Sequence, residues 1–197
     1  MDSDYYLSGL FNDVTIQALT AGPVVALSLA ILLLYVSAFV SASEIAFFSL
    51  EQEDLNTIRK GDHPADNTIQ HFLKNPEYLL ATILIFNNLA NVTVIVLCTY
   101  VFNGLFDFSN IPVAGFITEV AALTFLLLLF GEIMPKIYAR KNSLRFARKS
   151  APIINVAVGL ARPLTKILVS STSVINKALA RKKNELSVDE LSKALEL

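Results

Sequence analysis

The sequence predicts an all-α membrane protein with three transmembrane helices. Of its 197 residues, 54% are hydrophobic and 17% charged, and the mean hydropathy is +0.55, which is too apolar for an ordinary soluble domain. Three largely uncharged stretches are long enough to cross a bilayer, which takes a helix of roughly 20 residues. They are Pro23–Ser43, Leu79–Phe106 and Ile111–Tyr138, the last interrupted by Glu119 and by a motif that starts at Gly131.

The distribution of lysine and arginine predicts the orientation of these spans. Arg59, Lys60 and Lys74 lie between the first two spans, and the next basic residue is Lys136. Because cytoplasmic loops collect positive charge, we expect the N-terminus outside and the C-terminus in the cytoplasm. The predicted parts are an extracytoplasmic segment (1–22), a three-span domain (23–139), cytoplasmic juxtamembrane helices (140–183) and the start of a linker helix (184–197).

The loop between the first two spans predicts a short cytoplasmic helical hairpin. Glu51–Glu77 is mixed in charge and contains the turn sequence Gly61-Asp62-His63-Pro64. His63 and His71 are interpreted as surface residues, because no cysteine or second pair of ligands accompanies them.

The C-terminal part predicts helices that lie along the cytoplasmic surface. Residues 151–180 carry apolar side chains at helical spacing, but Arg162 and Lys166 interrupt them. The alternative is a fourth spanning helix. Ser187-Val188-Asp189-Glu190 resembles a capping box that starts a new helix, and we expect the natural sequence to continue beyond Leu197.

The most informative motif is Gly131-Glu132-Ile133-Met134-Pro135-Lys136, at the end of an uncharged run. A carboxylate inside a membrane span is costly and marks a functional site by default. Pro135 has no N–H, so the carbonyl of Gly131 loses its helical donor. A carboxylate beside a free carbonyl suits a hard cation such as magnesium. The alternative is a proline kink that serves packing alone.

Polar residues in the other two spans are predicted to lie at about the same depth in the membrane as Glu132. Ser37, Ser41 and Glu44 share one helix face, whereas Ser43 lies off it. Asn87 and Asn91 are one turn apart in the second span. Counted along the helices, these groups and Glu132 all fall in the cytoplasmic half of the membrane. Their donors are all oxygen, which favours magnesium or sodium over zinc or copper.

Three short motifs, taken in this order, resemble the transmembrane (DUF21) domain of the CNNM/CorC family of magnesium transporters. They are Ser41-Ala42-Ser43-Glu44-Ile45-Ala46, Asn87-Asn88-Leu89-Ala90-Asn91 and the Gly131 motif. The resemblance implies magnesium export coupled to sodium entry, in a homodimer in the bacterial inner membrane. It also implies cytoplasmic CBS domains that bind ATP and would follow this chain. The metal-site residues that it implies are Ser41, Ser43, Asn87, Asn91, Gly131 and Glu132.

One position departs from the family pattern, and it keeps a second function open. Phe86 stands where the family usually has glycine, directly before the first asparagine, and a phenylalanine there could crowd the site. The alternative function is therefore a membrane scaffold or regulatory subunit that does not transport. We expect no enzymatic activity, because the spans contain no histidine for a metalloprotease or a Ser/His pair. The net charge of −1 gives no indication of nucleic-acid binding.

Overall fold

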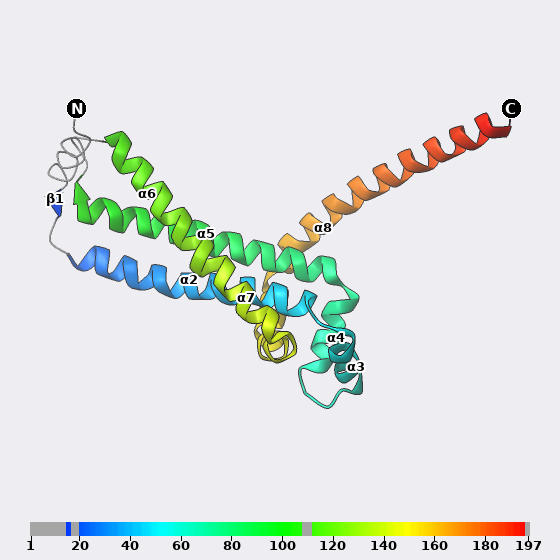
Figure 1. The fold of residues 1–197 in the computed structure, drawn as a ribbon, viewed down its shortest axis with the longest axis horizontal. Coiled ribbons are helices and arrows are strands. Elements are labelled where there is room, and N and C mark those ends of the chain that lie inside the picture. Colours follow the sequence, from blue (N-terminus) through cyan, green and yellow to red (C-terminus); the bar gives the residue numbers. More distant parts are fainter. Residues whose placement is uncertain (1–14, 17–19, 108–111, 196–197) are drawn as a thin grey trace, which may run out of the picture.

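The computed structural model describes residues 15–16, 20–107 and 112–195, with side chains described for 20–106 and 112–170. Most of these residues are helical, as predicted (Figure 1). A two-residue strand β1, Thr15–Ile16, pairs antiparallel with β2, Phe106–Asp107. This pairing places the segment before the first long helix beside the end of the second. The predicted extracytoplasmic segment lies mostly outside the described residues.

Three long helical stretches form the bundle (Figure 1). Helix α2 spans Ala21–Phe48 and packs along α5, Pro76–Leu105. The third stretch consists of α6 (Pro112–Leu126), the π-helix η1 (Leu127–Ile133) and α7 (Met134–Lys141). Alanines 26, 30, 42 and 46 of α2 are all buried. Small side chains of this kind let membrane helices approach closely.

Two short helices connect α2 to α5. They are α3, Gln52–Lys60, and α4, Asp66–Lys74. The Glu51 N–H donates to the Asp54 carboxylate at the start of α3 (3.1 Å). Gly61 ends α3 with a φ of 73°, a left-handed conformation that favours glycine.

The C-terminal region differs from the prediction of several helices. A single helix, α8, spans Ser143–Leu195 and continues through Pro152, Pro163 and the capping-box sequence at Ser187. The prediction of a new helix at Ser187 is therefore wrong. Proline removes one hydrogen bond and bends a helix, but here buried residues on both sides of Pro152, Ala151 and Ile154, hold the chain in place.

Helix length does not decide how many segments cross the membrane. Among the described residues, four helical segments are long and apolar enough to span a bilayer: the three stretches of the bundle and Ser143–Ser170. In Figure 1 the first turns of α8 are seen nearly end-on, whereas α2 and α5 lie nearly in the plane of the picture. The start of α8 therefore runs crosswise to the bundle.

The buried apolar core lies at one end of the bundle, where α2, α5, the two short helices and α8 meet. The Phe47 and Phe72 rings pack edge to face, with centroids 5.6 Å apart. The main residues of this core are Ala42, Ala46, Phe47, Ile58, Ile69, Phe72, Leu79, Ile83, Ala147, Ala151 and Ile154. Elsewhere the bundle presents large apolar side chains outward, as a protein surrounded by lipid does.

A buried ion pair joins the short helices to α8. The Asp66 side chain is fully buried, and Arg148 donates to it through Nε (2.9 Å) and Nη2 (3.0 Å). Burial alone would raise the pKa of Asp66. The hydrogen bonds from Arg148 and from the His63 backbone, with the charges of both residues, lower the pKa below its ordinary value of 3.8. The pair therefore fixes the position of α8 against α4.

We expect Asp66→Asn to lower the free energy of unfolding by about 3 kcal/mol, because it leaves Arg148 charged and poorly paired. Thermal unfolding in detergent measures the loss, with Asp62→Asn in the exposed turn as the control. Since folding lowers the pKa, the stabilisation is present above pH 3.8 and is lost as the pH falls through the folded pKa. Equal unfolding temperatures for wild type and Asp66→Asn would refute this role.

Candidate functional site

The Gly131 motif starts in the π-helix η1 and continues into α7, rather than forming a simple proline kink. At the end of η1 the Met134 N–H donates to the Leu129 carbonyl, five residues earlier. Pro135 comes next and has no N–H. Pro135 therefore cannot donate a hydrogen bond to the Phe130 carbonyl, five residues earlier as in a π-helix. Nor can it donate to the Gly131 carbonyl, four residues earlier as in an α-helix. Short π-helical segments inside α-helices frequently lie at functional sites.

Gly131 is the point where this π-helix approaches the other two helices. It is buried. A Cβ atom added to it would lie 3.5 Å from Leu34 Cδ1, 3.7 Å from Ser37 Oγ and 4.0 Å from Asn91 Oδ1. These are ordinary contact distances. The absence of a side chain therefore leaves an open position between the backbone of η1 and polar oxygens of α2 and α5.

Serines of α2 and asparagines of α5 form one hydrogen-bonded group beside Gly131. Ser37 Oγ lies 2.9 Å from Asn87 Oδ1 and 2.5 Å from Asn91 Oδ1, and its one proton can be donated to either oxygen. Ser41 Oγ also donates to Asn87 Oδ1 (3.1 Å). Both serines are fully buried. We call Ser37, Ser41, Asn87, Asn91 and Gly131 the oxygen cluster.

The remaining predicted site residues have other surroundings. The Ser43 hydroxyl donates to the Phe39 carbonyl of its own helix (2.7 Å), as its position off the shared face implies. Glu132 is half-buried and directly follows Gly131. Ser37 was not among the predicted site residues, although it shares a helix face with Ser41. That shared face was the signal that could have identified it.

Phe86 does not occupy the oxygen cluster. It is half-buried and packs against the apolar core, on a different side of α5 from Asn87, because neighbouring helical residues point about 100° apart. The expectation that Phe86 could crowd the site is not supported by this packing.

A cavity of about 340 Å³ reaches the oxygen cluster from the end of the bundle that holds the short helices. Asn87 lines it together with Glu44 and Glu77, and Leu168 and Val169 of α8 form part of its wall. The Glu44 carboxylate lies 3.4 Å from the ammonium group of Lys136 on α7. Because Lys136 offsets the charge of Glu44, the acidic character of this cavity, which attracts cations, comes mainly from Glu77.

The chemistry of the oxygen cluster suits a hard cation better than a transition metal. Hydroxyl, amide and backbone oxygens gather there, with Glu132 adjacent as a carboxylate. In the part of the chain that the structure describes, no three His, Cys, Asp or Glu side chains gather closely enough to hold a metal ion. Magnesium keeps several of its waters and is commonly bound through one or two carboxylates, so it does not require such a group.

The fold and the oxygen cluster define an integral membrane protein with a polar site enclosed between three helices. The family model described as "Cyclin M transmembrane N-terminal domain" matches residues 28–197. The chain therefore belongs to the CNNM family.

Three relatives are similar over most of this chain. A UPF0053 protein from Haemophilus influenzae is 27% identical over 165 residues, which cover 82% of this chain and 38% of the relative. The UPF0053 inner membrane protein YfjD from Escherichia coli is 27% identical over 158 residues (80% and 36%). Metal transporter cnnm-4 from Caenorhabditis elegans is 26% identical over 152 residues (75% and 31%). The matched region thus spans about a third of each relative.

The hydrogen bonds of the oxygen cluster predict an energetic coupling between α2 and α5. In a double-mutant cycle, we expect Ser37→Ala and Asn91→Ala to be coupled by about 0.6–1.7 kcal/mol, the range for hydrogen bonds between membrane helices. Reversible unfolding in detergent gives the four free energies. Ser28→Ala is the matched control, because the Ser28 hydroxyl bonds only the Val24 carbonyl of its own helix. Strictly additive effects of Ser37→Ala and Asn91→Ala would contradict the coupling.

Proposed function

We propose that this chain is the membrane domain of a magnesium transporter, with the oxygen cluster and Glu132 as its ion site. The observation that carries the proposal is the meeting of oxygen donors from α2 and α5 at Gly131, where η1 has no side chain. The relative named as a metal transporter supports the same kind of activity. This proposal is for transport and not for catalysis.

The proposed topology has three spans, with α8 starting at the membrane surface. The basic residues of the short helices, such as Lys60 and Lys74, and those of α7 and early α8, such as Arg140 and Arg145, lie toward the same end of the bundle. This end is proposed to be cytoplasmic, which leaves the β1–β2 pairing outside. The E. coli relative, named an inner membrane protein, supports a location in that membrane.

Magnesium is proposed to enter from the cytoplasm through the 340 Å³ cavity. Glu44 and Glu77 attract the hydrated ion, and Asn87 is the first member of the oxygen cluster that it meets. Because the serine hydroxyls now donate to the asparagine oxygens, they must turn to offer lone pairs to a cation. Glu132 would supply the negative charge. Since magnesium sheds water reluctantly, it is proposed to bind partly hydrated.

The direction of magnesium transport and the assembly of the chain into a homodimer are also proposals. The family resemblance supports export driven by sodium entry, and ATP would act only through CBS domains outside this chain. A homodimer is consistent with the apolar side chains that α6 presents outward, among them Phe116 and Phe125, 67% and 66% exposed.

Gly131→Ala tests the site directly. Its Cβ would make only ordinary contacts, so we expect the fold to be retained, but it would occupy the space where the cation approaches the Gly131 carbonyl. We predict at least a tenfold loss of magnesium flux into proteoliposomes, followed with an enclosed magnesium-sensitive dye. Gly159→Ala is the matched control, because nothing lies within 4 Å of a Cβ at that position.

A scaffold function predicts a different outcome. Wild type would then show no magnesium flux above empty liposomes, and magnesium would not raise its unfolding temperature. Either normal flux in folded Gly131→Ala or the absence of flux in wild type would contradict the proposed site.

A further inference from the structure

A second and larger cavity lies between α5 and α6, on the opposite side of the oxygen cluster from the acidic cavity. Its volume is about 940 Å³. It extends along α6 from Pro112 to Leu127, the first residue of η1. Leu127 is one helical turn, roughly 6 Å of rise, before Gly131. The cavity therefore begins near the β1–β2 end of the bundle and stops just short of the oxygen cluster.

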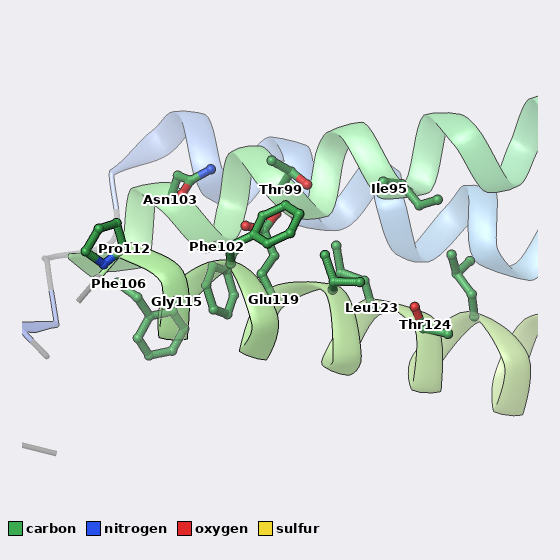
Figure 2. A pocket seen from close by; sticks show the side chains of 13 residues that line it. Ile95, Thr99, Phe102, Asn103, Phe106, Pro112, Gly115, Glu119, Leu123 and Thr124 are labelled. Carbon is green, nitrogen blue, oxygen red and sulfur yellow. The ribbon is translucent and has the colours of Figure 1, made fainter. Parts of the chain in front are cut away.

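Among the residues whose side chains are described, Glu119 is the carboxylate that lines this cavity. Figure 2 shows it pointing from α6 toward α5. It lies roughly 10 Å of helix from Pro112 and roughly 18 Å from Gly131. The side chains just before and after it in the sequence, Thr118 and Val120, are exposed, whereas Glu119 is half-buried.

The other polar residues of the cavity come from both of its walls. Thr99 and Asn103 lie one turn apart on α5, and Thr124 lies on α6 (Figure 2). In the region with described side chains, no lysine or arginine lines the cavity or lies within ion-pair distance of Glu119. The ion pairs in that region join Lys136 to Glu44 and Arg148 to Asp66. A carboxylate at membrane depth is costly unless water or a cation accompanies it.

We propose that Glu119 forms a second cation site in this cavity, which binds a hydrated hard cation between the oxygen cluster and the β1–β2 end. The proposal rests on the proposed transport function, because it makes the cavity the outer part of the ion path. The volume leaves room for the waters that such a cation keeps. Glu119 provides the charge, and Thr99 and Asn103 provide oxygens for the ion or its waters.

Two sites on one path have a physical advantage. Conduction requires binding that is favourable enough to admit an ion and weak enough to release it. A single carboxylate with neutral oxygens in an open cavity is expected to bind more weakly than an enclosed group of oxygens. Glu119 would therefore receive an ion leaving the oxygen cluster, or hold one that enters in exchange.

The packing of α6 would allow this helix to move and so to open the separation between the Glu119 cavity and the oxygen cluster. In α6, Gly115 is the buried residue, and the rest of this helix is exposed or half-buried. The helix is thus lightly packed, while η1 packs against α2. A shift of α6 relative to α5 would connect the large cavity to the oxygen cluster without disturbing the core at the other end.

The test counts bound cations in the full chain in detergent, by equilibrium dialysis with magnesium chloride alone and with sodium chloride alone. We expect Glu119→Gln to lose about one bound cation per chain and to slow magnesium flux at least fivefold. Glu119→Asp should retain the number of bound cations and the magnesium flux of wild type. The salt in which the count falls identifies the ion as divalent or monovalent. Glu53→Gln, on the exposed surface of α3, is the control.

The same experiment separates this proposal from the proposed function. Asn91→Ala should remove cation binding at the oxygen cluster but leave cation binding at Glu119 unchanged. If Asn91→Ala binds as much magnesium as wild type while Glu119→Gln binds less, the proposed ion site at the oxygen cluster is refuted and the Glu119 site is supported. If folded Glu119→Gln binds both cations and transports like wild type, the Glu119 site is overturned.

Discussion

The hydrogen bonds from Ser37 and Ser41 to Asn87, with Asn91 beside Ser37, are the interaction on which the rest of the bundle depends. They fix the register of α2 against α5 at the height where η1 contacts both helices. In lipid, helices associate through close packing and polar contacts rather than through the hydrophobic effect. The buried alanines of α2 provide the packing and the oxygen cluster provides the polar contacts. A cation at Gly131 would compete for the same oxygens, so binding and helix association are linked.

Two cavities lie on opposite sides of this contact. The smaller one is lined by Glu44 and Glu77, and the larger one by Glu119. Neither is lined by the whole oxygen cluster, and Gly131 lines neither of them. This arrangement fits the proposed transport, in which a central site would be reached from each side of the membrane in turn. Helix α6, which is lightly packed, is the element best placed to move, and the π-helix that follows it can absorb the movement because α-helical and π-helical hydrogen bonding differ by one residue in register.

Much of the fold follows from simple patterns in the sequence, whereas the details of the site do not. Uncharged runs and prolines located the three long helices, and counting residues along them predicted that Ser41, Asn87 and Glu132 all fall in the cytoplasmic half of the membrane. Ser37 was missed, and the Ser43 hydroxyl bonds its own helix, because depth does not specify which way a side chain points. Pro135 predicted a lost donor but not the seven-residue π-helix that results. The length of α8 was missed because Pro152, Pro163 and the capping-box sequence at Ser187 are local signals for a helix end or start, and the helix continues through all three.

The most direct test is the position of a bound cation. Manganese resembles magnesium in its preference for oxygen ligands, and its anomalous scattering locates it in crystals of the full chain. We predict a peak within coordination distance of the Gly131 carbonyl and Asn91 Oδ1, which disappears in Gly131→Ala. Well-diffracting crystals soaked in manganese with no peak among Ser37, Asn91 and Gly131 would contradict the account.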